Sequence, residues 1–210
     1  AEDFVVSAAG LTLDYSKAQL DRPSRESLLQ LAEDSQWHAK MKAMLCGESV
    51  NETENRAALH TLLRASSNNG LPDLYAQVSD TRAQMKQWAE RINDGELTGF
   101  SGQTITDVVN IGIGGSDLGP RLATEALTPF HSTIACHYVA NVDPADIQGT
   151  LLNLNPASTL FIICSKSFRT EETLTNALAA RSWLVSAGAS TEDLENHFLA
   201  ITTNLEAAAQ

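Results

Sequence analysis

A glycine-rich loop follows a short apolar run in the middle of the chain. The run Asp107–Gly112 (DVVNIG) is typical of a buried strand, and the loop continues as GIGGSDLGP to Pro120. Glycine lets a backbone pass close to a ligand, and Ser116 adds a hydroxyl where a helical pattern begins. Because free amides at the start of a helix favour an anion, the loop predicts an anion site. A glycine-rich turn without a ligand is the alternative.

Two common nucleotide-binding motifs do not fit this loop. A dinucleotide-binding fingerprint needs a third glycine where Asp117 stands, and a P-loop needs Lys followed by Ser or Thr where Pro120 stands. A nicotinamide-binding domain, in which Asp143 would hold the ribose, is therefore disfavoured.

A second polar loop follows the apolar run Thr159–Cys164. Four of its residues have hydroxyl or ammonium groups within a single strand-to-helix turn: Ser165, Lys166, Ser167 and Thr170. Hydroxyls and turn amides donate to phosphate oxygens, and each hydrogen bond to a charged group contributes roughly 1.5–3 kcal/mol net. The alternative is that Thr170 only caps the next helix. Two such loops on one sheet favour a phosphate site.

Alternating apolar runs and helical patterns must position these loops. Strands are predicted at 107–112, 137–142, 159–164 and 199–204, and helices at 117–127, 145–154, 174–185 and 191–195. This alternation predicts an α/β fold, with a parallel sheet covered by helices on both faces. Ligands of such folds bind beyond the carboxyl ends of the strands, where both polar loops lie.

The first hundred residues are predicted to be mainly helical. One helical pattern begins at Pro23 and ends at Gly47, a second runs from Thr53 to Leu63, and a third follows the stripe Val78–Ile92. We therefore predict a mainly helical region at 1–98 and a phosphate-binding α/β domain at 99–210. Since the last residues before Gln210 begin a helix without completing it, we expect a fragment of a longer protein.

Net charge restricts the partners. The chain carries 14 basic and 26 acidic residues, a net charge of −12, which disfavours binding to nucleic acid or an anionic membrane. No apolar run approaches the roughly 18–20 residues of a membrane span. Glu2 and Asp3 stand where a secretion signal would be basic, so we expect a cytoplasmic protein.

Cysteine and histidine spacing predicts neither a disulfide framework nor a metal site. Cys46, Cys136 and Cys164 are odd in number and lack metal-ligand spacing. The last two lie in apolar runs, so we predict reduced core thiols. The five histidines, which include His131, form no close pair.

The two loops together resemble the signatures of the glucose-6-phosphate isomerase family. Residues 110–120 (NIGIGGSDLGP) resemble its glycine-rich signature, and residues 165–176 (SKSFRTEETLTN) resemble its second phosphate loop, usually SKTFTT followed by x-E-T. Weaker similarity extends over residues 13–17, 51–56 and 59–60, so the resemblance covers essentially the whole chain. It implies that the chain corresponds to the first part of a family member.

The resemblance implies roles for individual residues. It implies a sugar-isomerase (SIS-like, Rossmann-like) fold in which Gly115 lets the sugar approach the backbone. The phosphate would contact Ser116, Ser165, Lys166, Ser167 and Thr170. Ser167 keeps the hydroxyl of the usual Thr, whereas Arg169 replaces a Thr and is expected to be exposed.

The family activity is an aldose–ketose isomerisation. Members interconvert glucose 6-phosphate and fructose 6-phosphate in glycolysis and gluconeogenesis, through an enediol and without a metal or organic cofactor. They work as homodimers. The groups that open the ring and move the proton lie in motifs that this chain lacks, and Glu172 matches a loop glutamate that is not the base. We therefore expect phosphate binding without a catalytic residue, and no activity of this segment alone. A regulatory SIS-type module that senses phosphosugars is the alternative.

Overall fold

The computed structural model describes residues 4–130 and 133–209. The chain divides into two compact units, residues 1–83 and 84–210, whereas the predicted domain boundary after residue 98 stays a prediction. Glu2, Asp3, His131 and Gln210, which entered the sequence-based expectations, lie outside the described residues. In the described ranges, no helix has both the length and the apolarity that a bilayer span requires.

The first unit begins with an antiparallel hairpin that the sequence pattern does not predict. Strand β1 (Val5–Ala8) pairs with β2 (Leu11–Asp14) across a turn at Ala9 and Gly10, both of which have positive φ. All eight strand residues are exposed. Leu11 and Leu13 alternate with polar residues in β2, but four residues are too short a run to identify a strand from the pattern alone.

Two helices replace the single helix predicted from Pro23 to Gly47, so that prediction is wrong. Helix α1 (Arg22–Asp34) is capped by Asp21, whose carboxylate accepts from Ser24 N–H at 2.9 Å. Helix α2 (Trp37–Leu45) begins after Gln36, whose φ of 55° places it in the left-handed region. A residue in that region cannot continue a right-handed helix.

The helix predicted from Thr53 to Leu63 is also wrong. Asn51 and Arg56 form an isolated antiparallel bridge, and Asn51 Oδ1 accepts from Thr53 Oγ1 at 2.8 Å and from Glu54 N–H at 3.2 Å. Such local side-chain bonds compete with helix formation. A 3₁₀ helix, η2 (His60–Arg64), follows. Helix α3 (Pro72–Asn93) confirms the third prediction and crosses the boundary between the units.

The second unit contains a four-stranded parallel sheet of order β4-β3-β5-β6, which confirms the α/β prediction. The strands are β3 (Asp107–Ile111), β4 (Ala135–Val139), β5 (Thr159–Cys164) and β6 (Phe198–Ile201). Strand β4 ends before the predicted residue 142 because the N–H groups of Ala140 and Asn141 donate to Asp146 instead. Strand β6 ends three residues before the predicted 204.

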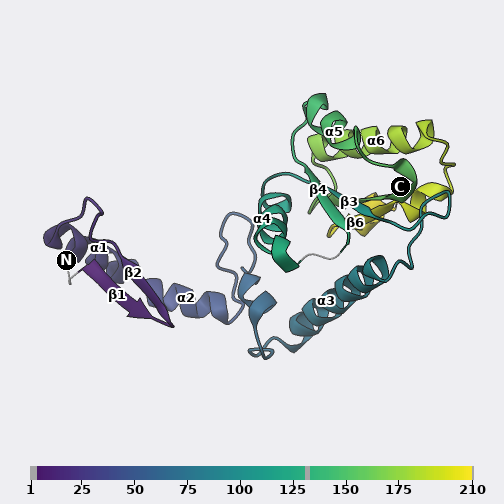
Figure 1. Cartoon of the computed structure of the whole chain (residues 1–210). Helices are drawn as coiled ribbons and strands as arrows, with labels where there is room; N and C mark the ends of the chain where they lie inside the picture. Colours follow the sequence, from purple (N-terminus) through teal and green to yellow (C-terminus); the bar gives the residue numbers. More distant parts are fainter. Residues whose placement is uncertain (1–3, 131–132, 210) are drawn as a thin grey trace. The chain divides into compact units, whose positions relative to one another are not determined.

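Helices lie on both faces of this sheet (Figure 1). Helices α5 (Pro144–Leu151) and α6 (Glu171–Ser186) cover one face, and α4 (Leu118–Ala126) lies beside β4 on the other. The segment predicted as a helix at 191–195 forms only a 3₁₀ turn, η6 (Asp193–Asn196). The remaining short elements are η3 (Gly114–Ser116), η4 (Thr128–Phe130), η5 (Pro156–Ser158) and α7 (Leu205–Ala208).

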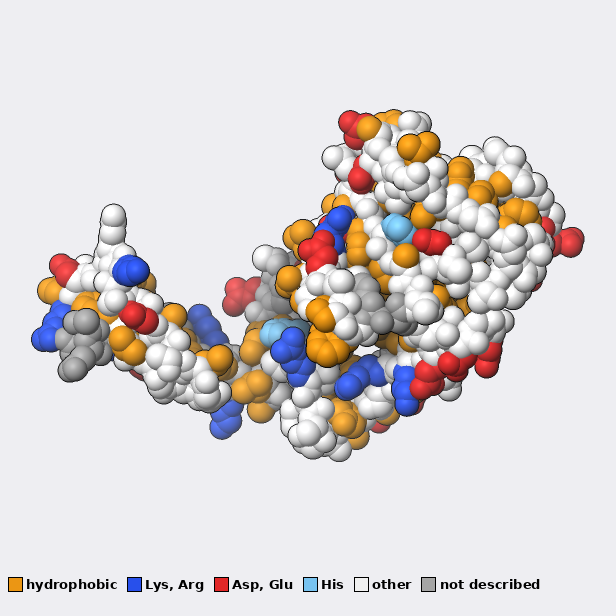
Figure 2. Space-filling view, in the orientation of Figure 1, with side chains coloured by type: hydrophobic (Ala, Val, Ile, Leu, Met, Phe, Trp, Pro, Cys, Tyr) orange, Lys and Arg blue, Asp and Glu red, His pale blue; other side chains and the backbone are white. Residues whose placement is uncertain are grey.

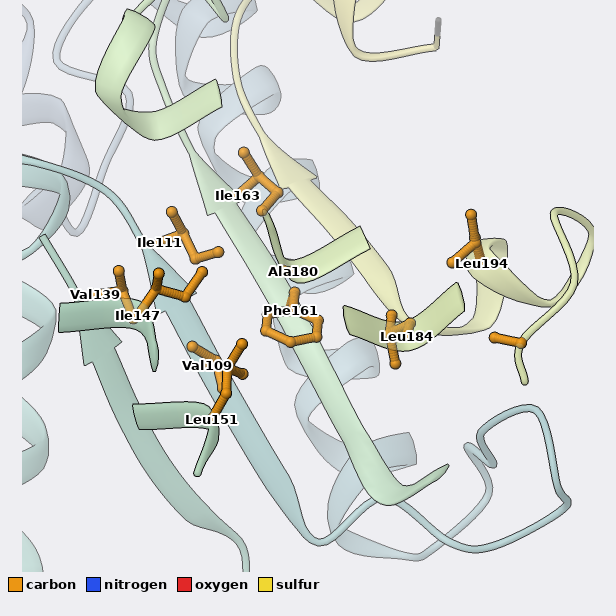
Figure 3. Packing of buried hydrophobic residues seen from close by; sticks show 11 residues of the cluster. Val109, Ile111, Val139, Ile147, Leu151, Phe161, Ile163, Ala180, Leu184 and Leu194 are labelled. Atoms are coloured by element: carbon orange, nitrogen blue, oxygen red, sulfur yellow. The ribbon is translucent and has the colours of Figure 1, made fainter. Parts of the chain in front are cut away.

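The main hydrophobic core lies between the sheet and the pair α5 and α6. Figure 3 shows Val109, Val139 and Phe161 from the strands among side chains of the two helices, such as Ile147 and Leu184. Full burial of one such side chain contributes roughly 1.5–3 kcal/mol. A smaller cluster joins Val108 and Leu160 on the other face to Ile92 and Ile105. The two polar loops therefore extend from strands that are packed on both faces.

Other hydrophobic side chains remain at the surface, where they are interspersed with charged groups (Figure 2). Leu118 and Leu122 are exposed on α4, one helical turn apart. Cys136 is exposed as well, so the prediction of a core thiol is wrong there. It lies on the edge strand β4, whereas Cys164 on the inner strand β5 is buried, as predicted.

A buried histidine joins three segments of the second unit. His197 is fully buried; its Nε2 accepts from Phe100 N–H at 2.9 Å, and its Nδ1 lies 2.7 Å from Thr159 O. Because Nε2 accepts, the ring proton is on Nδ1 and donates to the carbonyl. The bond to Thr159 O is buried, and the bond from Phe100 N–H is partly buried.

We expect His197→Ala to lower the free energy of unfolding of the second unit by about 3 kcal/mol, since it leaves a partly buried N–H and a buried carbonyl without these bonds. Urea denaturation followed by far-UV circular dichroism measures the loss. His60→Ala is the control, because His60 is exposed in the first unit. Equal midpoints for His197→Ala and the unsubstituted protein would refute the structural role.

Candidate functional site

The two polar loops extend from adjacent parallel strands. Strands β3 and β5 pair in register from Asp107 opposite Thr159 to Ile111 opposite Ile163. Because both strands run in the same direction, the loops that begin at Gly112 and Ser165 leave the same edge of the sheet. The sequence-based expectation that both loops share one edge is confirmed for the backbone.

Gly112 allows the two loops to approach closely. A Cβ atom at this position would lie 2.8 Å from Ser116 Cβ and 3.0 Å from the carbonyl oxygen of Cys164. Any side chain would therefore push the glycine loop away from the end of β5. Gly115, in contrast, is exposed and has open space around the position of a Cβ atom, and Ser116 is half-buried.

A buried polar network connects the two loops behind Gly112. The side-chain amide of Asn110 donates to Ser116 O at 2.9 Å, and the thiol of Cys164 donates to Asn110 Oδ1 at 3.0 Å. The residues are on β3, η3 and β5, so the bonds fix the glycine loop relative to both strands. The sequence-based site does not include Asn110, although an amide inside an apolar strand is the signal that could have identified it.

The second loop holds its hydroxyls close together. Ser165 is buried, Thr170 is half-buried, and their hydroxyl oxygens lie 3.2 Å apart. Thr170 is the N-cap residue of α6, yet its side chain makes no capping hydrogen bond. Its hydroxyl therefore serves the turn rather than the helix end. Phe168, between them, has a φ of 53°, which is unusual for a residue with a side chain.

A cavity of about 410 Å³ opens where the two loops meet. Three predicted site residues line it, namely Gly115, Ser116 and Lys166, and the other lining residues are Pro120, Cys164, Ile201, Thr202 and Thr203. Ser165, Ser167 and Thr170 do not line the cavity, although they belong to the same turn as Lys166. The predicted phosphate contacts of all six residues stay predictions.

A third loop, which the sequence-based site omits, lies against the second. Lys166 O accepts from Thr203 N–H at 3.0 Å, from the hydroxyl of Thr203 at 2.8 Å and from the hydroxyl of Thr202 at 3.1 Å. The side-chain amide of Asn204 donates to Ser167 O at 3.0 Å. Because residues 199–204 are predicted as one strand, these side chains could not be recognised as a loop at the end of β6.

The charged groups of the loops differ in their environment. Lys166 and Arg169 are exposed, the latter as expected. The acid of the glycine loop, Asp117, is buried and pairs with Arg121 through Nη2 at 2.8 Å and Nε at 3.1 Å. Arg121 therefore compensates the negative charge of Asp117. The positive charge of Lys166 on the second loop is then not cancelled by this carboxylate and can favour an anion in the cavity. Among the described residues, no group of three or more His, Cys, Asp or Glu side chains could hold a metal ion.

A larger pocket of about 480 Å³ lies along the edge strand β4, between α4 and α5. Arg121, His137 and Tyr138 are among its lining residues, but none of the six predicted site residues is. Ligands of parallel α/β sheets bind beyond the carboxyl ends of the strands, so the smaller cavity at the strand ends is the candidate site.

Comparisons with known proteins agree with this architecture. Residues 14–210 match the model of the phosphoglucose isomerase family. The chain is 47% identical over 212 residues to a glucose-6-phosphate isomerase of Hahella chejuensis and 44% identical over 213 residues to that of Shewanella halifaxensis. Each match covers 99% of this chain but only 38% and 39%, respectively, of the relative.

A solved structure shares the fold. The crystal structure of a glucose-6-phosphate isomerase from Chlamydia trachomatis aligns with a TM-score of 0.78 at 24% sequence identity, over 96% of this chain and 39% of that one. The predicted α/β class is therefore confirmed by a solved structure as well as by the sheet itself.

Burial raises the pKa of the Cys164 thiol to about 11. At pH 8 only about one molecule in a thousand then carries the reactive thiolate. We expect Cys164 to react with iodoacetamide at least about ten times more slowly than the exposed Cys46, and its rate to rise as the pH approaches 11. Peptide mass spectrometry resolves the two rates. Similar rates for both residues at pH 8 would contradict the buried, hydrogen-bonded thiol.

Proposed function

Because the chain belongs to the phosphoglucose isomerase family, we propose that its strand-end cavity binds the phosphate group of a sugar phosphate. The proposed activity of the whole protein is the interconversion of glucose 6-phosphate and fructose 6-phosphate, in glycolysis and gluconeogenesis. A single observation carries the proposal for this chain: Ser116 of the first loop and Lys166 of the second line the same cavity.

The geometry suits a dianion. The Lys166 ammonium supplies a positive charge, and the Ser116 hydroxyl is available from the opposite loop. The clustered hydroxyls of Ser165 and Thr170 lie within the same turn as Lys166. Charge-assisted hydrogen bonds of this kind are about twice as strong as neutral ones, so a few of them account for useful affinity. The open space at Gly115 leaves room for the sugar to approach the backbone.

The proposed contribution of this chain to the reaction is binding and orientation. Isomerisation through an enediol moves a proton between neighbouring carbons, which requires a general base close to them. Holding the phosphate fixes the position of those carbons relative to such a base. We assign no base in this chain: Glu172 is exposed on α6 and is not among the residues that line the cavity. We further propose a cytoplasmic homodimer as the working form of the whole protein.

Lys166→Ala in the intact protein should weaken glucose 6-phosphate binding roughly 10- to 100-fold, since it removes a charged donor from the phosphate. Isothermal titration calorimetry measures the dissociation constant. Lys86→Ala is the matched control, because Lys86 lies on α3 and pairs with Glu90 at 3.5 Å. Unchanged affinity of Lys166→Ala would remove this residue from the site.

The 210-residue chain alone should show no isomerase turnover, while the intact protein should convert fructose 6-phosphate to glucose 6-phosphate. A coupled assay with glucose-6-phosphate dehydrogenase measures both. Robust turnover by the isolated chain would contradict the assignment of binding without catalysis. Binding without turnover by the intact protein would instead favour a phosphosugar-sensing module.

A further inference from the structure

We propose that the loop Thr202–Asn204, directly after β6, is a positioning element for the Lys166–Ser167 turn and thereby sets the affinity of the cavity for phosphate. The proposal rests on the proposed function and extends it to residues outside the two signature loops. We name the loop Thr202–Asn204 the clamp loop. Its side chains act through the turn that they hold, so they are positioning residues rather than catalytic ones.

The clamp loop engages two consecutive carbonyl groups of the turn. Lys166 O accepts three hydrogen bonds, from Thr203 N–H, the Thr203 hydroxyl and the Thr202 hydroxyl, at 3.0, 2.8 and 3.1 Å. Ser167 O accepts from the Asn204 amide at 3.0 Å. A carbonyl oxygen has two lone pairs, so these three donors fully occupy the acceptor capacity of Lys166 O.

These bonds determine which groups of the turn face a ligand. A carbonyl oxygen that points at a bound dianion repels it, whereas an amide N–H attracts it. A trans peptide places its N–H and its carbonyl on opposite sides. By holding Lys166 O, the clamp loop keeps this oxygen occupied and directs Ser167 N–H away from itself. An anion that lies on the side of the turn opposite the clamp loop then meets a donor rather than an acceptor.

The turn requires such support because its backbone is strained. Phe168, the next residue, has a φ of 53°, a left-handed conformation that is strained for a residue other than glycine. Phe168 N–H donates to Ser165 O at 3.2 Å, which closes the turn, and its half-buried ring packs against the main core. The bonds of the clamp loop and this packing together hold the strained conformation.

The clamp loop is itself fixed at both ends. Strand β6 pairs with β5 as far as Ile201 opposite Cys164, and Ser165 N–H donates to Ile201 O at 3.1 Å. Asn204 Oδ1 accepts from Ala207 N–H at 3.2 Å and from there reaches across to Ser167 through its amide. Thr202 and Thr203 also line the candidate cavity beside Lys166, so the clamp loop and the phosphate turn share one surface.

The test replaces the clamp hydroxyls by isosteric methyl groups in the intact protein. We expect Thr203→Val to weaken binding of glucose 6-phosphate about threefold and the double variant Thr202→Val/Thr203→Val about tenfold, because one or two hydrogen bonds to Lys166 O are lost. Inorganic phosphate, used as a second probe, should lose affinity by the same factor, since the effect acts on the phosphate and not on the sugar. Thr203→Ser, which retains the hydroxyl, should bind like the unsubstituted protein.

Thr150→Val is the matched control, because the Thr150 hydroxyl donates to Asp146 O at 3.0 Å within α5, away from the candidate cavity. Calorimetry gives the affinities, and urea denaturation of the unliganded variants gives their stability. If the double variant bound both probes as tightly as the unsubstituted protein while Lys166→Ala bound them more weakly, the positioning role would be overturned but the proposed function would stand. A loss of stability without a loss of affinity would overturn it too. If the unsubstituted protein bound neither probe, the proposed function would fail and this inference with it.

Discussion

The parallel pairing of β3 with β5 is the constraint on which the candidate site depends. In a parallel pair, two loops that follow the strands leave the same edge of the sheet. Register then determines how close they come: Ile111 lies opposite Ile163, so Gly112 and Cys164 are neighbours at that edge. Gly112 has no side chain to separate them, and the bonds of Asn110 to Ser116 and of Cys164 to Asn110 fix the remaining distance. The cavity exists because two buried strands end together.

The parts of the fold that depend on the core were predictable from sequence. Strands β3 and β5 are central and packed on both faces, and therefore appear as mainly apolar runs; the predicted limits match β5 and exceed β3 by one residue, Gly112. Strand β4 is an edge strand with a partly exposed surface, and its limits were misplaced. In the first unit, Gln36 adopts a left-handed conformation, although glutamine has no preference for positive φ. An apolar helical pattern cannot reveal such a break, so one helix was predicted where two exist.

The residues of the candidate site could be predicted by one rule: glycine and hydroxyl residues that directly follow a strand are expected to bind an anion. That rule identified Gly115, Ser116 and Lys166, which line the cavity. It could not identify Thr202 and Thr203, because two threonines after an apolar run are as compatible with a strand as with a loop. Their function in the structure comes from hydrogen bonds to a carbonyl group 36 and 37 residues earlier in the chain. Long-range bonds to the backbone leave no local pattern in the sequence.

The proposed anion site is compatible with a net charge of −12 because electrostatic forces between exposed charges have a short range in salt solution. At physiological ionic strength, exposed charges more than about 8 Å apart are largely screened, so the sum over the molecule does not determine the potential inside a small cavity. The local charges do. Asp117, the acid of the glycine loop, is buried in a pair with Arg121, and Lys166 adds an ammonium group at the cavity. Backbone N–H groups add partial positive charge where the neighbouring carbonyl groups accept hydrogen bonds from other parts of the chain. Under the proposed function, the three hydrogen bonds to Lys166 O are electrostatic as well as structural, because they occupy a carbonyl oxygen that would repel a bound dianion.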